Sequence, residues 1–341
     1  MDTRRAVLDA LSAGPVAGPE LAERVDVSRA AVWKQIEALR ENGFRIEATE
    51  DGYVVRSVPS YGADAIRFGL DAPYEIAYYE SIGSTNDRAR ELAEEGVTDV
   101  AVVADEQTGG RGRLDREWTA PSGGVYSSLV IRPDLPPAHA AIVTLAAAVA
   151  TTDACRELGV DARIKWPNDV LHPDGQGDRG GAKLAGILTE MTGEADRVSW
   201  MIVGTGVNAN VDVDELPPGA TSLRSVLGSD IDRRRFLQRL LERVHELIET
   251  PTDVLPAWRE HAMTIGERVR IETTTDVIEG TAIDVEFPGA LVVRTEAGRR
   301  RILSGDCQHL RPIGAADATS NGSNGDTDEN PDGDGTRSPE R

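Results

Sequence analysis

The sequence predicts a multi-domain protein with a small helical domain and a β-hairpin first, then a central α+β domain, then a small β-barrel. At 341 residues the chain is too long for one ordinary core. Its hydrophobic pattern changes near residue 60 from short helices to strands alternating with helices, and near residue 263 to short alternating strands. We therefore expect domains at 1–58, 64–262 and 263–312, followed by a tail at 313–341.

The composition is that of a soluble acidic protein with a formal net charge of −21. Such acidity speaks against nucleic-acid binding by the chain as a whole. Lysine occurs only at Lys34, Lys165 and Lys183, and arginine supplies the remaining positive charge. An acidic surface with arginine in place of lysine suits a protein of concentrated salt solutions, where the Debye length falls to about 3 Å at 1 M. In such a chain each remaining lysine is a candidate for a specific role.

The cysteines and the apolar segments indicate a cytoplasmic protein. Cys155 and Cys307 lie far apart and share no metal-like spacing with histidine, which argues against a zinc site or a disulfide framework. The start of the chain lacks a continuous apolar signal core. The most apolar segment, residues 140–150, is well short of the roughly 20 residues that cross a bilayer. We expect no membrane partner.

The N-terminal residues predict three helices and a hairpin. Helices are expected at 4–13, at 18–27 with Pro19 near the start, and from Ser28 as N-cap to Gly43 as the residue after the helix. The tight joint between the last two is the helix-turn-helix spacing, and the strands around residues 50–52 would form a wing.

The exposed face of the third predicted helix gathers groups that suit contact with DNA. We expect base edges and phosphates to be contacted by Ser28, Arg29, Trp33 and Lys34, with Gln35 as a further candidate. The alternative is that this is any small helical domain, because such domains cap and turn in the same way. Acidic and basic residues in this segment nearly balance, so its net charge does not by itself favour DNA binding.

The central and C-terminal segments alternate strands, helices and turns. We expect strands at 74–82, 100–107, 123–133 and 199–210, a hairpin formed by 162–172 and 182–193, and helices at 85–96, 140–159 and 232–249. Short strands at 265–310, broken at Gly280, Pro288-Gly289 and Ala297-Gly298, predict the barrel. The tail has almost nothing to bury and should be disordered.

Four stretches of the central segment are candidates for chemistry: GSTND (83–87), EQTGGRGRLDREW (106–118), KWPNDV with GAKLAGI (165–170 and 181–187) and VGTGVNAN (203–210). The Gly-Arg loop is no Walker A motif, since no Gly-Lys-Ser/Thr follows, and no dinucleotide fingerprint. It could be an arginine-rich surface loop or a nucleic-acid contact. However, glycine lets backbone amides approach an anion and arginine donates bidentate hydrogen bonds, so Arg111, Arg113 and Arg116 can close over a phosphate-bearing ligand, with Trp118 as an anchor.

Taken together, the four stretches resemble the biotin protein ligase family in its bifunctional form, over about residues 1–311. The family's patterns GRGR-x-G-R-x-W, KWPND, KLAGIL and G-x-G-x-N occur here in the same order. The resemblance implies an N-terminal winged helix-turn-helix, a catalytic domain of the class II synthetase and biotin ligase type, and a C-terminal SH3-like barrel. One departure is Asp115, which stands where the family has glycine and would weaken loop closure or adenylate retention.

The resemblance also implies a two-step reaction and its participants. Biotin and ATP form biotinyl-5′-AMP with Mg²⁺ assisting, and the biotinyl group then passes to a lysine of a biotin carboxyl carrier domain. No covalent enzyme intermediate is needed, so the protein positions its substrates and stabilises charge. The family further implies biotin-responsive repression at an operator DNA and a homodimer upon adenylate binding.

The resemblance assigns roles to matched positions. The catalytic residues would be Lys183 and Arg113. The biotin-binding residues would be Ser84, Thr85, Asn86, Gln107, Arg111, Gly112, Arg113 and Lys183. The ATP- and adenylate-binding residues would be Arg111, Arg113, Arg116, Trp118, Lys165, Asn168, Asp169, Gly204, Gly206 and Asn208. Mg²⁺ would bind through the phosphates, with Asp169 and Asn208 as candidate ligands.

Structural alternatives remain open for several of these residues. Trp166-Pro167 could only shape a turn, Gly204 and Gly206 could serve packing, and Asn86 could be a helix cap. A lipoate or octanoyl ligase shares the fold and the catalytic lysine. A rival of another class is a pure transcriptional regulator that senses biotinyl-AMP or another nucleotide.

Overall fold

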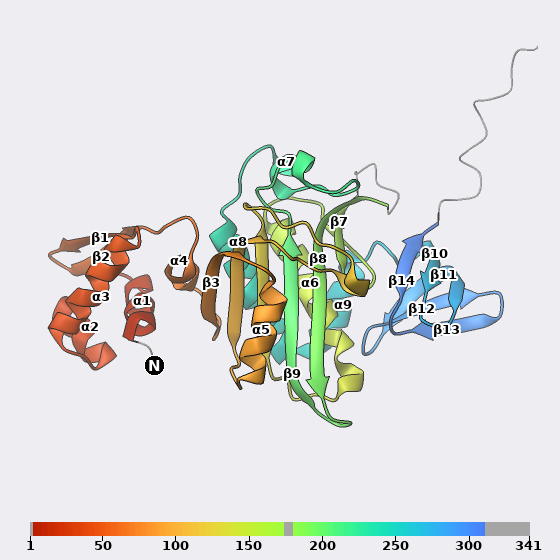
Figure 1. Ribbon diagram of the computed structural model, residues 1–341, viewed down its shortest axis with the longest axis horizontal. Coiled ribbons are helices and arrows are strands. Elements are labelled where there is room, and N and C mark those ends of the chain that lie inside the picture. The colour runs from red at the N-terminus through yellow and green to blue at the C-terminus, as the bar shows by residue number, and fades with distance from the viewer. Residues whose placement is uncertain (1–2, 174–179, 311–341) are drawn as a thin grey trace, which may run out of the picture.

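The computed structural model describes residues 3–173 and 180–310. Figure 1 shows an N-terminal helical unit at one end, a central unit of sheet and helices, and a small β unit at the other end. The predicted tail at 313–341 lies outside the described residues.

The N-terminal unit forms as the sequence predicts. Its elements are α1 (Thr3–Ser12), α2 (Gly18–Val25), α3 (Arg29–Glu41), β1 (Arg45–Thr49) and β2 (Gly52–Ser57). The Ser28 hydroxyl caps α3 by accepting a hydrogen bond from the Ala31 amide at 3.2 Å, which satisfies one of the free N–H groups of the first turn. Val32, Ile36 and Leu39 of α3 are buried in the core of this unit. A bridge between Val16 and Tyr53 also joins the chain between α1 and α2 to the hairpin, which no sequence pattern indicated.

The central unit is built on a seven-stranded sheet with the order β3-β4-β5-β9-β8-β7-β6. Only β3 and β4 are parallel, and every other neighbouring pair is antiparallel. The strands are β3 (Glu75–Ile82), β4 (Val100–Gln107), β5 (Val125–Ile131), β6 (Arg163–Lys165), β7 (Asp169–His172), β8 (Ala182–Gly193) and β9 (Val198–Val207). The predicted hairpin of 162–172 with 182–193 is thus wrong in one detail, because the first range already contains the hairpin β6–β7, and β7 then pairs with β8.

Helices cover both faces of this sheet (Figure 1). Val100 and Val102 of β4 pack toward α5 (Thr85–Glu94), whereas Ala101 and Val103 point into the larger core under α6 (Ala141–Glu157). The other helical segments are α4 (Ala63–Arg67), α7 (Leu223–Leu227), α8 (Arg233–Glu249), α9 (Val254–His261), η1 (Arg113–Asp115), η2 (Pro137–His139), η3 (Val213–Glu215) and η4 (Pro251–Asp253).

One described helical stretch, Pro137–Glu157, is long and apolar enough to cross a membrane by length and composition. It contains α6, and 72% of its most apolar window is buried inside the protein. The helix packs against α8, α9 and the sheet. It is therefore the core helix of the central unit.

The C-terminal unit is a five-stranded antiparallel sheet with the order β13-β12-β11-β10-β14. Its strands are β10 (Arg268–Glu272), β11 (Val277–Glu286), β12 (Ala290–Thr295), β13 (Gly298–Ile302) and β14 (Asp306–His309). In the described residues β13 and β14 do not pair with each other, so the hydrogen-bonded ladder is an open sheet and not a closed barrel. Its apolar face shares one continuous core with the central unit.

Candidate active site

One cavity of about 560 Å³ lies where the central sheet, the Gly-Arg loop and the C-terminal sheet meet. Every residue that the sequence analysis assigns to biotin or to the adenylate lines it. These residues are Ser84, Thr85, Asn86, Gln107, Arg111, Gly112, Arg113, Arg116, Trp118, Lys165, Asn168, Asp169, Lys183, Gly204, Gly206 and Asn208. Residues up to 124 positions apart in the sequence, from Ser84 to Asn208, therefore line one cavity.

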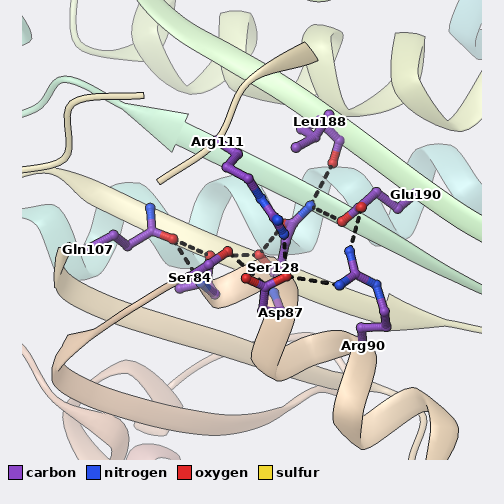
Figure 2. Close-up of polar contacts among 10 residues, drawn as sticks. Ser84, Asp87, Arg90, Gln107, Arg111, Ser128, Leu188 and Glu190 are labelled. Carbon is purple, nitrogen blue, oxygen red and sulfur yellow. Dashed lines mark hydrogen bonds and ion pairs between the residues drawn. The ribbon is translucent and has the colours of Figure 1, made fainter. Parts of the chain in front are cut away.

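The first turn of α5 forms a hydrogen-bonded corner of this cavity (Figure 2). The Thr85 amide donates to Gln107 Oε1 at 2.8 Å, and the Thr85 hydroxyl lies 3.0 Å from the same oxygen. Ser128 Oγ lies 2.7 Å from Thr85 Oγ1 and 2.6 Å from Asn86 Oδ1. Because the Gln107 oxygen is already engaged, its amide nitrogen is the end left to meet a ligand.

Asn86 is not the cap of this helix, which settles one structural alternative. The cap is Ser84, whose hydroxyl accepts from the Asp87 amide at 3.3 Å. The Asn86 amide nitrogen instead donates to Glu190 Oε2 at 2.8 Å, across to β8. A Cβ at Gly204 would lie 2.2 Å from Asn86 Oδ1, so glycine is required there for this asparagine to fit.

The Gly-Arg loop, which we call the lid (residues 109–118), folds back on itself like a hairpin over the cavity. The Gly112 amide donates to the Arg116 carbonyl at 2.7 Å, and the Trp118 amide donates to the Gly110 carbonyl at 3.0 Å. A Cβ at Gly110 would lie 2.5 Å from the Trp118 carbonyl oxygen, so only glycine permits this approach. The side chain of Asp115 lies outside the described residues.

The three lid arginines reach three different parts of the molecule. Arg111 forms an ion pair with Asp87 of α5. Arg113 donates to Asn168 Oδ1 and to the Gly305 carbonyl, each at 2.8 Å. Arg116 lies 2.6 Å from Asp306, in the C-terminal sheet. The lid is thus fastened both to the central unit and to the C-terminal unit.

The electrostatic environment favours the charged forms of Arg116 and Asp306, the ion pair that joins the lid to the C-terminal sheet. Burial alone would raise the pKa of Asp306, but the hydrogen bond and charge of Arg116, together with the charges of Arg113 and Lys165, lower it. The hydrogen bond to Asp306 raises the pKa of Arg116. Burial lowers the pKa of Arg113, although arginine stays protonated at neutral pH. Arg113 is a half-buried cation whose two hydrogen-bond partners, Asn168 and the Gly305 carbonyl, are neutral, so its charge suits an anionic ligand.

Lys183 and the lid face the same space. Lys183 Nζ, on β8, lies 2.6 Å from Asp169 Oδ1 and 5.3 Å from the centroid of the Trp118 ring. A Cβ at Gly206 would lie 2.8 Å from the Trp118 ring, so this glycine lets the indole lie against β9. Trp118 Nε1 is buried without a partner among the described residues.

Asn208 offers a buried oxygen to the cavity. Its amide nitrogen donates to the carbonyls of Lys183 at 3.2 Å and Thr221 at 3.0 Å, which fixes the orientation of the side chain. Its Oδ1 is buried and has no partner in the described chain. Among the described residues no group of three or more His, Cys, Asp or Glu could hold a metal by itself. An Mg²⁺ ion carried by phosphates fits this donor set, because Mg²⁺ takes one or two protein oxygens and leaves the rest to phosphates and water.

The KWPND segment ties the site to the C-terminal sheet. Lys165 is buried in the cavity wall. The Trp166 indole donates to the Gly289 carbonyl at 3.0 Å, and the Trp166 amide donates to Thr264 Oγ1 at 3.0 Å. Trp166 therefore does more than shape a turn, because it holds two units together.

Sequence reasoning missed several parts of the site. Residues Asp306–His309 of β14 line the cavity but lie far along the chain from every motif. Residues Pro217–Ala220 also line it and follow the last motif closely, but they carry no motif of their own. Ser128 is fully buried inside a strand, where its hydroxyl alone signalled little. Asp87 and Glu190 lie within or beside quoted motifs but received no role.

The predicted DNA-contacting residues lie on the surface of the N-terminal unit, away from the cavity. Ser28, Arg29, Trp33 and Lys34 are exposed, and Gln35 is half-buried. Trp33 is 59% exposed, which is unusual for tryptophan unless a partner covers it. The Ser28 hydroxyl serves as the helix cap.

Comparison with known proteins finds matches in each of the three units. Residues 78–208 match the biotin/lipoate A/B protein ligase family, residues 264–310 match the biotin protein ligase C-terminal domain, and residues 3–54 match an HTH domain. The bifunctional ligase/repressor BirA of Bacillus subtilis is 36% identical over 312 residues, covering 86% of this chain and 93% of that protein. The biotin–[acetyl-CoA-carboxylase] ligase of Paracoccus denitrificans is 36% identical over 232 residues, covering 64% of this chain and 94% of that protein.

Solved structures agree with these matches. The biotin protein ligase from Aquifex aeolicus in complex with biotin and ATP superposes with a TM-score of 0.58 at 28% identity, and the match covers 70% of this chain and 99% of that one.

Proposed function

Because this chain belongs to the biotin/lipoate A/B protein ligase family, we propose that it is an ATP-dependent biotin protein ligase that also acts as a biotin-responsive repressor. In the first step a carboxylate oxygen of biotin attacks the α-phosphorus of ATP, and pyrophosphate leaves. In the second step the amine of a carrier lysine attacks the acyl carbon of biotinyl-5′-AMP, and AMP leaves as the new amide forms.

One observation carries the enzymatic proposal: Lys183 and the lid converge on a single cavity. Lys183 lies against the Trp118 ring, and Arg113 of the same lid is bonded to Asn168, next to the Lys183 partner Asp169. A compact ammonium suits the charge that develops between the biotin carboxylate and the phosphate. The guanidinium groups suit the planar oxygens of a phosphoryl group.

The lid would then protect the intermediate. A mixed anhydride of a carboxylic acid and a phosphate is readily hydrolysed, so a site that retains it must exclude water. Arg113 and Arg116 fasten the lid to the C-terminal sheet, which closes the cavity on that side. Arg111 and Gly112 would cover biotin, and Trp118 would cover the adenylate.

The corner at α5 would recognise the head of biotin. Ser84, Thr85, Asn86 and Gln107 form a fixed set of hydrogen-bonding groups at this corner, and the amide nitrogen of Gln107 would donate to the ligand. The phosphate side would use Lys165, Asn168 and Asp169 with the close backbone at Gly204 and Gly206. Mg²⁺, when bound, neutralises phosphate charge, and Asp169 and the free Asn208 oxygen would hold it.

The proposal has four further parts, which concern the domains, the acceptor, the assembly and the compartment. We keep the division at 1–58, 64–262 and 263–312, with the open C-terminal sheet as the SH3-like domain of this family. The acceptor would be a biotin carboxyl carrier domain, and adenylate binding would favour a homodimer. The whole would act in the cytoplasm, since ATP and carrier are found there.

Labelling of a carrier tests the enzymatic function. The purified chain is incubated with biotin, ATP, Mg²⁺ and a carrier domain, and biotin on the acceptor lysine is measured by mass spectrometry. We expect labelling that requires both biotin and ATP. Lipoate in place of biotin, with a lipoyl carrier, is the matched arm: transfer of lipoate but not biotin would replace this proposal by a lipoate ligase.

The exposed face of α3 favours the second function. Arg29, Trp33 and Lys34 lie uncovered on a helix-turn-helix, and relatives named for repression share 36% identity over most of the chain. Gel-shift measurements on the chain's own promoter, with and without biotin and ATP, should show binding that depends on both. The double variant Arg29→Ala, Lys34→Ala should lose this binding and keep carrier labelling. No shift under any condition would leave the unit without a DNA role.

A further inference from the structure

Asp87 lies in the quoted GSTND stretch and is unused by the reaction steps above. Its carboxylate Oδ1 accepts from Arg90 Nη1 at 2.9 Å and forms the ion pair with Arg111 of the lid (Figure 2). Two arginines thus share one carboxylate oxygen, one from the same helix and one from the lid. Asp87 does not line the cavity itself.

A second carboxylate, that of Glu190, holds the arginine that binds Asp87. Glu190, on β8, accepts from Arg90 Nη2 at 2.5 Å through one oxygen and from the Asn86 amide at 2.8 Å through the other. An unbroken chain of contacts therefore runs from Asn86 through Glu190, Arg90 and Asp87 to Arg111. Single exposed ion pairs contribute little, whereas a network of charges with fixed geometry contributes more.

The geometry of Arg111 indicates the role of this network of charged residues. Guanidinium has five N–H donors in one plane. Within the described chain Asp87 is the one side-chain partner of Arg111, so the remaining donors are left for a ligand. Fixing one edge of the group lowers the rotamer entropy that is lost when the other edge binds an anion.

We propose that Asp87 is a positioning residue that holds lid Arg111 in place for the acyl phosphate, with Arg90 and Glu190 holding Asp87. This proposal rests on the proposed ligase function for the identity of the ligand. It makes lid order in the ligand-free protein depend on the charge of Asp87. It also couples the lid to the biotin-facing Asn86, because Glu190 accepts hydrogen bonds both from Asn86 and from Arg90, which binds Asp87.

The test compares Asp87→Asn with a matched control on the same helix. Glu91 pairs with Arg88 at 2.7 Å with the same i,i+3 spacing as Asp87 and Arg90, and it lies outside the cavity. In biotin-dependent ATP–pyrophosphate exchange, Asp87→Asn should raise KM for biotin roughly three- to tenfold and shorten the lifetime of bound biotinyl-AMP by a similar factor, with kcat within about twofold. Asp87→Glu should restore most of the wild-type KM, and Glu91→Gln should match wild type.

A second readout needs no ligase activity. Hydrogen–deuterium exchange of the lid amides, measured without substrates, should speed up in Asp87→Asn and not in Glu91→Gln. Unchanged KM, adenylate lifetime and lid exchange in Asp87→Asn would overturn the proposal, and so would a longer adenylate lifetime, since Asp87 would then merely compete with the ligand. If the wild type catalyses no ATP–pyrophosphate exchange, the proposed ligase function is wrong. The hydrogen–deuterium exchange of the lid amides then still decides whether Asp87 holds the lid.

Discussion

At the residue scale, Lys183 is the most informative residue, because lysine is rare in this chain and this lysine lies in the cavity. It is one of three lysines in a chain with net charge −21. In the structure Lys183 meets an acidic side chain, an aromatic ring and the lid within one cavity. A lysine kept only for solubility would lie on the surface and not in a cavity wall.

Lys183→Ala should abolish adenylate formation and leave the fold intact. Removing one charge-stabilising donor costs about 10²–10³ in rate, and this cation would serve both reactants. Biotin-dependent ATP–pyrophosphate exchange measures the loss, and circular dichroism checks the fold. Lys34→Ala, the same substitution on an exposed helix, is the matched control and should be fully active. Normal exchange by Lys183→Ala would refute its role.

His309 gives the structure a defined response to acid. Burial, helped by the positive charge of Lys165, lowers the pKa of His309 from 6.5 to about 4. Below pH 6.5 the unfolded chain therefore gains a proton that the folded chain refuses until about pH 4, so acid lowers the free energy of unfolding.

Between pH 7.5 and 5, urea denaturation should show that His309→Gln loses about 1–2 kcal/mol less stability than the wild type does. Glutamine keeps a hydrogen-bonding group near Thr264, which lies 3.1 Å from the imidazole. Equal losses in the two proteins would mean that His309 titrates normally.

At the element scale, the lid is where prediction and structure can best be compared. Its glycines and arginines predicted a loop closing over an anion, and its residues do line the cavity. The anchors at Gly305 and Asp306 could not be predicted, because they lie about 190 residues away and only the packed C-terminal sheet brings them near. Likewise, β6 and β7 have three and four residues, too few to show an alternating pattern.

Arg113→Gly should open the lid without blocking adenylate formation completely. The variant loses the bonds to Asn168 and Gly305, two hydrogen bonds from a charged group. We expect biotinyl-AMP to escape tenfold or more faster and to label lysines on bystander proteins. Arg197→Gly, at a side chain that is 74% exposed on another turn, should retain the adenylate normally. Wild-type retention in Arg113→Gly would remove the lid role.

At the scale of the whole molecule, the central and C-terminal units share one hydrophobic core, whereas the N-terminal unit has a core of its own and meets the central unit through ion pairs. Arg67 pairs with Asp9 at 2.7 Å and joins the N-terminal unit to the central one. The order of units followed from changes in hydrophobic period, which depend on local sequence. Their packing did not, because contacts such as Trp166 with Gly289 depend on distant partners.

The charge of the whole chain predicts dependence on salt. Net charge −21 makes the compact state repel itself, and salt screens that repulsion. We expect the melting temperature to rise as KCl increases from about 0.1 to 1 M, near which the Debye length is about 3 Å. Full stability in dilute buffer would argue against adaptation to salt.

The central claim is that one cavity makes and retains an acyl adenylate under the lid. The most direct measurement incubates the chain with biotin, lipoate, ATP and Mg²⁺, removes free small molecules, denatures the protein and identifies what is released by mass spectrometry. The account predicts biotinyl-5′-AMP in near-equal amount to the protein, and none from Lys183→Ala. Lipoyl-AMP as the main product, or no adenylate from the wild type, would contradict it.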